Sequence, residues 1–580
     1  MIRTLAAQIK EYKKASIMTP VFMIFEVIME TLIPVLMASI IDLGVEKGDM
    51  DHIARTGVIM VIVALASLAF GLLGAVYASK ASAGFAKNLR QAMFENIQTF
   101  SFSNIDRFST ASLVTRLTTD VTNLQNSFQM LLRMAMRAPF TLLFAMIMSF
   151  SINARLATVY LGAIIFLGCI MGFLISRAHG FFKQVFEKYD DLNAGVQENI
   201  TAIREVKSFV REDSQIERFK KANLNIYKMF IGAEKHMIAI APSMMLTVYS
   251  CIILISWFGA KMIVSDELTT GQLMSLLTYC MNILMNLMML SMIAVMMTMS
   301  QASAKRICEV LNEESDMKDP EDPVTVVTSG DISFENVSFR YFEHSEKPVL
   351  ENINLDIRSG ETIGIIGATG SAKTSLVNLI SRLYDVDSGC VKVGGVDVRN
   401  YKMSSLRKAV AVVLQKNVLF SGTVMENLRW GNENADEAAC RKACEMACAH
   451  EFIEKLEKGY DSVVEQGGSN FSGGQRQRLC IARALMSEPK VLILDDSTSA
   501  VDTATDAKIR EAFKKSIPGV TKIIIAQRMS SVEFADRIIV MDDGRVNAVG
   551  THEELLENNE IYREVYMMQT GGSKDFDGVI

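Results

Sequence analysis

The residues best suited to chemistry form a glycine-containing loop, GATGSAKTS, at positions 367–375. An apolar strand precedes the loop and a helical stretch follows it, which is the context in which backbone N–H groups and a helix N-terminus bind phosphate. Lys373 is placed to reach terminal phosphates, and the Thr374 hydroxyl is placed to face Mg²⁺. The loop therefore predicts a nucleotide-binding site.

One position in this loop departs from the pattern G-x-x-x-x-G-K-[ST]. Ala372 stands where the pattern has its second glycine. The alanine is tolerable if its backbone keeps a negative φ and costly if φ is positive, because only glycine adopts positive φ freely. The sequence leaves both cases open. We expect the added methyl group to weaken or slow nucleotide binding and not to abolish it.

Two adjacent carboxylates end a second apolar strand, within KVLILDDSTSAVD at residues 490–502. Asp495, at the strand end, suits a Mg²⁺-linked role, and Asp496 lies where a base would polarise water for attack on the γ-phosphate. An acidic turn is the alternative, which the pairing with a phosphate loop disfavours. Between the two motifs, Ser472-Gly473-Gly474-Gln475 could open a helix whose N-terminus binds an anion, although such strings also cap ordinary helices.

The elements that must position these groups fall into two halves of different composition. The chain has 580 residues, too many for one ordinary domain, and half of them are hydrophobic. Apolar runs near or above the ~20 residues that cross a bilayer lie in the first half. They are residues 17–42, 57–79, 131–152, 157–176, 237–264 and 270–299. An even number of spans returns the chain to its starting side, and the charged residues within them form no conspicuous cluster that would mark an ion pathway.

The loops predict the orientation. Long connections at residues 80–130 and 177–236 are rich in Lys and Arg, whereas the short ones are not, which places both termini in the cytoplasm. Residues 1–16 suit a helix at the membrane interface, with an ordinary solvated helix as the alternative. Two mixed segments, 101–125 and 196–212, have helical spacing and are either docking elements for a second domain or plain helical hairpins.

The second half begins after an acidic, proline-containing stretch at residues 313–330, which is typical of a linker. Short β-branched runs then alternate with helical stretches, which indicates an α/β domain with a largely parallel sheet. We therefore predict an all-α membrane domain of six spanning helices at 1–312, a linker at 313–330, and an α/β P-loop nucleotide-binding domain at 331–580.

Charge and cysteine content exclude other classes. The net charge of −6 and the lack of a polybasic tail give no sign of a nucleic-acid partner. The nine cysteines are scattered, so no disulfide framework is expected. Cys440, Cys444 and Cys448 share one helical face, which favours a small buried stripe over a metal site.

Taken together, these motifs resemble those of ATP-binding-cassette (ABC) exporter half-transporters, in family order and over nearly the whole chain. The resemblance identifies Gln415 in VVLQKNVLF with the glutamine loop and Tyr341 in SFRY with the aromatic residue that stacks on adenine. The residues that it assigns to ATP are Tyr341, Gly367, Ala368, Thr369, Gly370, Ser371, Ala372, Lys373, Thr374, Ser375, Ser472, Gly473, Gly474, Gln475 and Asp502. The residues that it assigns to Mg²⁺ are Thr374, Gln415 and Asp495.

The resemblance also implies a second subunit. Two such chains sandwich two ATP molecules, each between one subunit's phosphate loop and the other's signature, SGGQ. Closing the sandwich turns the membrane cavity outward, and hydrolysis resets it. The segments 101–125 and 196–212 match the family's coupling helices, which dock on the nucleotide domains.

Three positions around the γ-phosphate depart from the family: Ala372 replaces glycine, Asp496 replaces glutamate, and Gln527 replaces histidine. Aspartate retracts the carboxylate by more than about 1 Å, and such a displacement can cost on the order of 100-fold in rate. Loss of the histidine should compound this non-additively. The binding groups Tyr341, Lys373, Thr374, Gln415 and Asp495 are all present. The site, whose catalytic residues are Asp496, Gln527 and Gln415, is therefore expected to hold ATP and hydrolyse it slowly.

An intact signature beside a defective catalytic set is similar to the degenerate subunit of heterodimeric bacterial multidrug ABC exporters. We therefore predict a heterodimer in a bacterial plasma membrane that exports amphiphilic drugs or lipids. The alternatives are a homodimeric exporter and a regulatory subunit whose nucleotide site acts as a clamp. Methionines at helical spacing in the last span, Met281, Met285, Met288 and Met292, suit either a substrate cavity or lipid-facing packing.

Overall fold

The computed structural model describes every residue except 343–344, 346, 497–500 and 572–580. The chain divides into two compact units. Met1–Gln98 and Thr110–Glu313 form the first, here called the helical unit, and Thr99–Ser109 and Glu314–Ile580 form the second, here called the α/β unit. Residues 99–109 therefore belong to the α/β unit although they lie between helices of the other unit in sequence.

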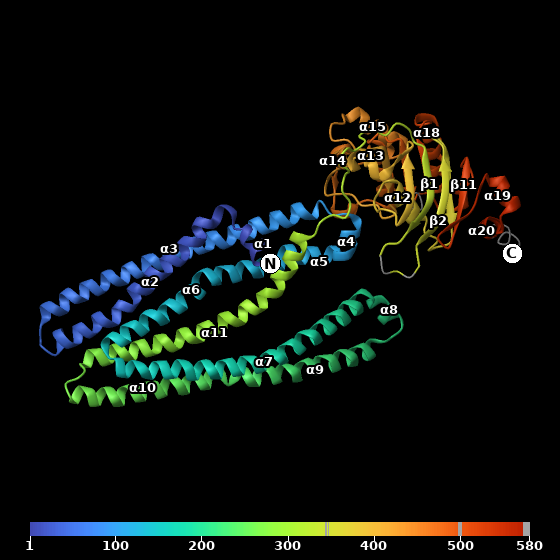
Figure 1. Ribbon diagram of the computed structural model, residues 1–580. Helices are drawn as coiled ribbons and strands as arrows, with labels where there is room; N and C mark the ends of the chain where they lie inside the picture. The colour runs from blue at the N-terminus through green and yellow to red at the C-terminus, as the bar shows by residue number, and fades with distance from the viewer. Residues whose placement is uncertain (343–344, 346, 497–500, 572–580) are drawn as a thin grey trace. The chain divides into compact units, whose positions relative to one another are not determined.

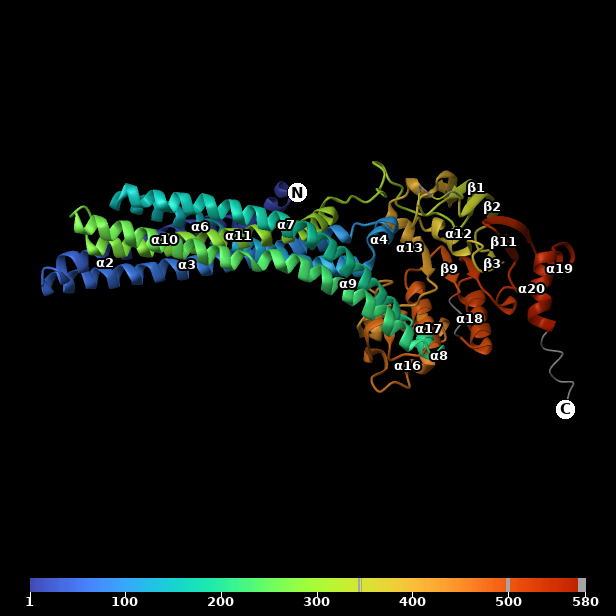
Figure 2. The same ribbon diagram turned by 90° about the horizontal axis from the view of Figure 1, so that it is seen from below.

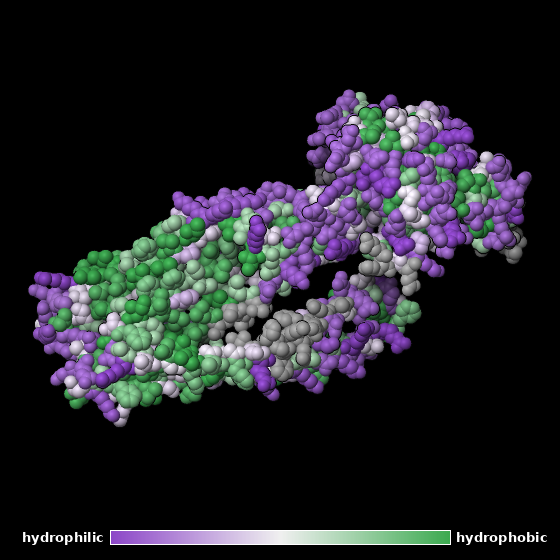
Figure 3. Space-filling view, viewed as in Figure 1, coloured by the Kyte–Doolittle hydropathy of each residue, from purple (hydrophilic) through white to green (hydrophobic). Residues whose placement is uncertain are grey.

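The helical unit consists of long helices that run along one another (Figures 1 and 2). Its elements are α1 (Ile2–Ala7), η1 (Lys10–Tyr12), α2 (Lys13–Ser39), η2 (Ile40–Val45), α3 (Met50–Ile97), α5 (Thr110–Thr115), η3 (Arg116–Asp120), α6 (Val121–Ile152), α7 (Ala154–Thr201), α8 (Ile203–Ser208), α9 (Glu212–Ile238), α10 (Ile240–Val264) and α11 (Thr270–Asn312). Apolar side chains cover much of the surface of these helices (Figure 3).

The six predicted spans are confirmed. Among the described residues, six helical stretches are long and apolar enough to cross a membrane. They are Lys10–Val45, Met50–Ile97, Thr110–Ile152, Ala154–Leu174, Ile240–Val264 and Thr270–Leu290. Several of these helices continue well beyond their apolar segments, as α7 does to Thr201, because the polar stretches that follow keep helical spacing.

The prediction that the spans hold no charge cluster is wrong. Arg137 of α6 lies with one guanidinium nitrogen 3.3 Å from Glu26 and another 2.7 Å from Glu30, both of α2. Each apolar run carries few charged residues by itself, and only the packing of α2 against α6 brings these three side chains together. We call Glu26, Glu30 and Arg137 the ion cluster.

The α/β unit is built from short strands and helices. Its elements are α4 (Phe102–Phe108), β1 (Ile332–Phe339), β2 (Leu350–Ile357), β3 (Thr362–Gly367), α12 (Lys373–Ile380), β4 (Ser388–Val393), β5 (Val396–Asp397), η4 (Val398–Asn400), α13 (Met403–Ala409), β6 (Val410–Val413), β7 (Gly422–Thr423), α14 (Val424–Arg429), α15 (Glu437–Met446), α16 (His450–Ile453), η5 (Gly459–Asp461), β8 (Val463–Val464), η6 (Gln466–Gly468), α17 (Gly473–Leu485), β9 (Val491–Asp495), α18 (Thr503–Ser516), β10 (Thr521–Ile525), η7 (Met529–Ser531), β11 (Arg537–Asp542), β12 (Arg545–Gly550), α19 (His552–Asn558) and α20 (Glu560–Gly571).

The main sheet has the strand order β12-β11-β3-β10-β9-β6, and only β12 is antiparallel to its neighbour. This confirms the predicted parallel sheet. Strands β9 and β10 are buried along their whole length, which is why their sequences read as continuous apolar runs. Ile525 pairs with both Ile365 and Asp495, so the carboxyl ends of β3, β9 and β10 meet at one edge, where ligands of such sheets bind.

A second, antiparallel sheet with the order β2-β1-β4-β5 was not predicted. Strand β2 alternates buried and exposed residues and carries Asn, Glu and Asp on its exposed positions, so it lacks the long apolar run that marks a strand of the main sheet. This sheet matters for the site because β1 ends at Phe339, two residues before Tyr341.

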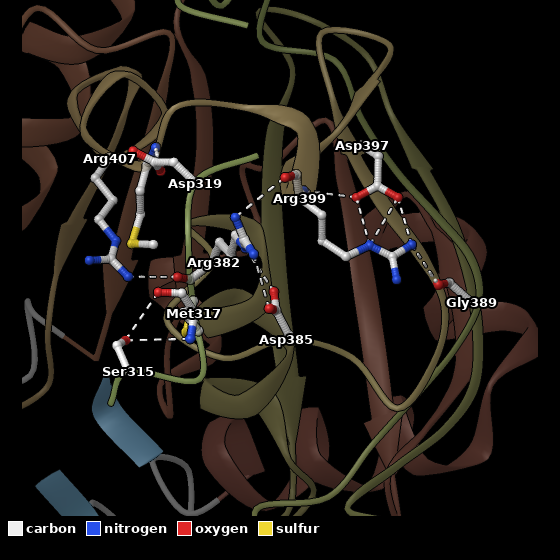
Figure 4. Close-up of polar contacts among 10 residues, drawn as sticks. Ser315, Met317, Asp319, Arg382, Asp385, Gly389, Asp397, Arg399 and Arg407 are labelled. Atoms are coloured by element: carbon white, nitrogen blue, oxygen red, sulfur yellow. Dashed lines mark hydrogen bonds and ion pairs between the residues drawn. The ribbon is translucent and has the colours of Figure 1, made fainter. Parts of the chain in front are cut away.

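The stretch after α11 is held on the α/β unit by backbone and side-chain contacts. Val324 donates from its backbone to Asn400 at 2.9 Å, and Asp319 accepts from the Met403 N–H at 2.8 Å. Beneath it, the buried Arg382 donates to Asp385 at 2.8 Å (Figure 4). Residues 314–330, which lie in the predicted linker, are thus grouped with the α/β unit and are hydrogen-bonded to it at Asp319 and Val324.

Candidate nucleotide site

The phosphate loop joins β3 to α12 and has the backbone that an anion-binding loop needs. Gly367 has φ +154° and Gly370 has φ +90°, where side chains are disfavoured. A Cβ on Gly367 would lie 2.2 Å from the carbonyl oxygen of Met541, so only glycine fits. The Lys373 ammonium donates to the carbonyl oxygens of Gly367 at 2.9 Å and Ala368 at 2.8 Å. Burial lowers the pKa of Lys373.

The structure decides the open question about Ala372. Its φ is +68° and its ψ is +23°, in the left-handed region, at the residue that caps α12. An L-residue with a side chain pays about 1–2 kcal/mol there, because its Cβ approaches the next carbonyl oxygen. The loop therefore keeps the glycine-type conformation with an alanine, and the strain is retained in the protein.

Replacing Ala372 with Gly is expected to raise the free energy of unfolding by about 0.5–1 kcal/mol. Relief of the left-handed strain outweighs the extra chain entropy that glycine gives the unfolded state. The measurement is the midpoint of thermal unfolding of the full chain. Ala368→Gly is the matched control, because Ala368 lies in the same loop without a positive φ and its change should be neutral or destabilising. Equal shifts for the two variants would contradict this account.

Of the three residues predicted to hold Mg²⁺, which are Thr374, Gln415 and Asp495, the first and the last lie in contact at the sheet edge. The Thr374 hydroxyl donates to Asp495, with oxygen–oxygen distances of 2.9 and 3.1 Å. Asp495 is only 2% exposed, and this burial raises its pKa. A hydroxyl beside a carboxylate is a donor set that suits Mg²⁺, which would neutralise charge on the phosphates when bound. The residues present therefore fit the ion, with Thr374 and Asp495 as its holders.

The three residues predicted to act in catalysis are brought together. One oxygen of Asp496 accepts from the side-chain amide of Gln527 at 2.8 Å and from that of Gln415 at 3.5 Å. Asp496 has φ +47°. The pKa of its carboxyl group is raised, because the effect of burial outweighs the opposing effect of the two amide donors. The arrangement gives a short carboxylate whose oxygen is already engaged by two amides.

The aromatic residue assigned to adenine is linked to the phosphate-loop helix and to α4. The Tyr341 hydroxyl lies 2.9 Å from that of Ser375, and its ring packs edge-on against Phe339 and Tyr384, with centroid distances of 4.8 and 5.0 Å. Tyr384 in turn donates to Asp106 of α4 at 2.7 Å. Sequence reasoning missed Tyr384 and Asp106, because the partners are 278 positions apart and no local pattern marks either one.

The signature residues form the start of α17. The Ser472 hydroxyl accepts from the Gln475 N–H at 3.3 Å, and the Gln475 side chain accepts from the Ser472 N–H at 2.9 Å. This reciprocal cap leaves the glycine N–H groups at the helix N-terminus. Within the described part of the chain, no hydrogen bond joins this motif to the phosphate loop.

Asp502, which the resemblance assigns to ATP, is the N-cap residue of α18. It caps α18 by accepting from the Thr505 N–H at 2.9 Å, and this hydrogen bond lowers its pKa. The preceding residues of the predicted STSAVD loop, 497–500, lie outside the described residues.

A further residue near the site, Gln569, was also not anticipated. Gln569 of α20 donates to the Gln527 carbonyl oxygen at 2.8 Å and accepts from the Met529 N–H at 2.8 Å. Two hydrogen bonds from one side chain fix the loop that carries Gln527. No motif marks Gln569, since it lies in an ordinary amphipathic helix.

Comparisons with known proteins agree with this geometry. The family model of the ABC transporter transmembrane region matches residues 16–309, and the family model described as ABC transporter matches residues 350–499. The chain is 37% identical over 563 residues to the uncharacterized ABC transporter ATP-binding protein YfiB of Bacillus subtilis, covering 97% of this chain and 98% of that protein. It is 29% identical to the ATP-dependent lipid A-core flippase of Hahella chejuensis, covering 86% and 85%.

A solved structure supports the fold. The structure of a bacterial Atm1-family ABC exporter with ATP bound superposes with a TM-score of 0.81, at 22% identity, covering 96% of this chain and 99% of that one. The match to the transmembrane region and the relationship to YfiB each extend over half of the chain or more. The chain therefore belongs to the ABC transporter family, as an exporter subunit that joins a six-helix transmembrane region to an ATP-binding domain.

Proposed function

We propose that this chain is the slow half of a heterodimeric exporter that uses ATP to move amphiphilic drugs or lipids across a bacterial plasma membrane. The observation that carries the proposal is the Asp496 carboxylate held by the amides of Gln527 and Gln415. The family resemblance implies a longer carboxylate and an imidazole in place of Asp496 and Gln527.

The contacts of Asp496 support slow hydrolysis. Its carboxylate reaches less far than that of a glutamate, and the oxygen that a water molecule would need already accepts two hydrogen bonds. An amide also cannot change charge near neutral pH as an imidazole does. Lys373, Thr374 and Asp495 keep the groups that bind MgATP, so the site is expected to bind tightly and turn over slowly.

The signature supports the need for a partner. Ser472 and Gln475 form an intact helix cap beside the N–H groups of Gly473 and Gly474, which suits the second face of an ATP sandwich. In such a pair, this chain supplies its signature to the partner's fast site. The basic long loops and the ATP site favour a cytoplasmic location for the α/β unit and both termini.

Two observations support the proposed substrate class, one on the helical unit and one on a relative. Met285 and Met292 of α11 are 59% and 65% exposed, so flexible apolar side chains are available to an apolar ligand. A relative that covers most of the chain is a lipid A-core flippase. Both support an amphiphile as the exported molecule.

The test is a pair of substitutions in the purified heterodimer. Asp496→Asn is expected to change ATP turnover by less than about twofold, because this site contributes little, whereas neutralising the partner's catalytic acid should lower turnover by on the order of 100-fold. Steady-state phosphate release measures both. Equal losses from the two substitutions would overturn the asymmetric model, and a chain that forms a transporting dimer by itself would support the homodimer instead.

A further inference from the structure

In the ion cluster, the two carboxylate oxygens of Glu26 have different surroundings. Glu26 lies about 14 Å along α2 from the start of its apolar run, at 1.5 Å per residue, and its side chain is 14% exposed. One of its oxygens, Oε1, lies 3.3 Å from Arg137. The other, Oε2, is buried and has no hydrogen-bond partner within the described part of the chain.

A glycine on the neighbouring helix α3 leaves room for the Glu26 carboxylate. It lies against the bare backbone of Gly71 on α3, where a Cβ would come within 3.1 Å of Oε1. Three helices, α2, α3 and α6, therefore enclose it. A buried carboxylate oxygen without a donor is costly, and ionisable groups within membrane spans commonly mark a ligand pathway.

The charges around Glu26 balance, so a hydrogen-bond acceptor and not a net charge distinguishes this site. Two carboxylates share one guanidinium, because Arg137 also pairs with Glu30 at 2.7 Å. Arg133, one turn earlier on α6, lies within electrostatic range of Glu26 and balances the remaining charge. A ligand is therefore selected by the free Oε2 atom, which accepts hydrogen bonds, rather than by a strong net field.

Aromatic residues lie close in sequence to Glu26 on α2 and to Gly71 on α3, and their rings pack on one another. On α2, Phe22 and Phe25 precede Glu26, and on α3, Phe70 and Tyr77 lie on either side of Gly71 in sequence. Phe70 lies 5.4 Å from Phe25 and 6.4 Å from Phe22 between ring centroids, and Tyr77 lies 5.4 Å from Phe22. Phe25 is 44% exposed. Aromatic faces attract organic cations, as a carboxylate does.

We propose that Glu26 and these rings form a binding site for the protonated amine of an amphiphile. The amine donates an N–H to Oε2 of Glu26, the rings contact the charged end, and the apolar tail lies along α2 and α3. This deepens the proposed function, on which it rests, because it gives the exported amphiphile a cationic head group.

The test measures binding without ATP. The full-length chain, with any partner that co-purifies, is reconstituted in lipid nanodiscs and titrated with radiolabelled dodecylamine, which is protonated at pH 7, or with dodecanol, which is uncharged. Glu26→Gln is expected to weaken dodecylamine binding at least about tenfold, because a charged hydrogen bond is lost, and to leave dodecanol binding within about twofold. Glu30→Gln, the matched control, should weaken dodecylamine binding less than about threefold.

Other outcomes are equally decisive. Dodecylamine binding that survives Glu26→Gln unchanged overturns the proposal, and so does an equal loss of both probes, which would indicate a structural role. Should Glu26→Gln not fold, Phe25→Leu keeps the charge and is expected to weaken dodecylamine binding about two- to fivefold, and an unchanged affinity overturns the site. Because no step uses ATP, failure of the heterodimer proposal would leave this result intact, and failure here would leave the Asp496 test intact.

Discussion

Changing Asp496 to Glu together with Gln527 to His is expected to raise ATP hydrolysis at this chain's own phosphate loop by on the order of 100-fold. The longer carboxylate regains the reach that the aspartate lacks. The imidazole replaces the amide that donates to Asp496 at 2.8 Å, so it frees the carboxylate oxygen and supplies a group that can contact the γ-phosphate. The gain is expected because the groups that bind MgATP, Lys373 and Thr374 among them, are already in place.

The measurement requires that the partner's ATP site does not hydrolyse ATP. Turnover is therefore measured in a heterodimer whose partner carries a neutralised catalytic acid, so that released phosphate reports this site alone. Each single substitution should give much less than the pair, since residues that act as a unit are non-additive. The Gln415→Ala variant of the restored site is a useful check, because Gln415 also donates to residue 496. A double variant as slow as the wild type would contradict the assignment of slow chemistry to these two residues.

Replacing Lys373 with Ala is expected to lower the affinity of this site for ATP about 10- to 100-fold. A hydrogen bond to a charged group contributes about 1.5–3 kcal/mol, and each 1.4 kcal/mol is a factor of ten in affinity. Lys373 is held at the loop by the Gly367 and Ala368 carbonyl oxygens, so its ammonium is already positioned for phosphate. Titration with a fluorescent ATP analogue, with the partner's phosphate-loop lysine also replaced, measures the effect.

The control for this substitution is Lys392→Ala, which removes a lysine that pairs with Glu335 on β1 at 2.6 Å, in a different sheet. It should leave ATP affinity within about twofold. Burial lowers the pKa of Lys373, and the charged form is the one that binds phosphate. Affinity in the wild type should therefore fall as pH rises through that lowered pKa, before an exposed lysine would lose its proton. Comparable losses from the two alanine variants would show that the effect is not local.

Local patterns in the sequence were enough to predict the membrane spans, the parallel sheet and the motifs of the nucleotide site. The six spans follow from runs of apolar residues, because lipid requires each crossing segment to satisfy its own backbone and present apolar side chains. The parallel sheet follows from short β-branched runs alternating with helices, because strands buried on both faces are apolar throughout. The phosphate loop, the paired carboxylates and the signature are contiguous motifs, so their presence could be read directly.

The tertiary structure decided what depends on conformation or on distant partners. The sign of φ at Ala372 is imposed by the turn from β3 into α12, and no residue type states it. Asp496 meets Gln527 and Gln415 across 31 and 81 positions because three strand ends converge at one edge of the sheet. Glu26 meets Arg137 only because α2 packs on α6. A sequence records which groups are available, and long-range packing sets which of them share a site, because those contacts have no local signature.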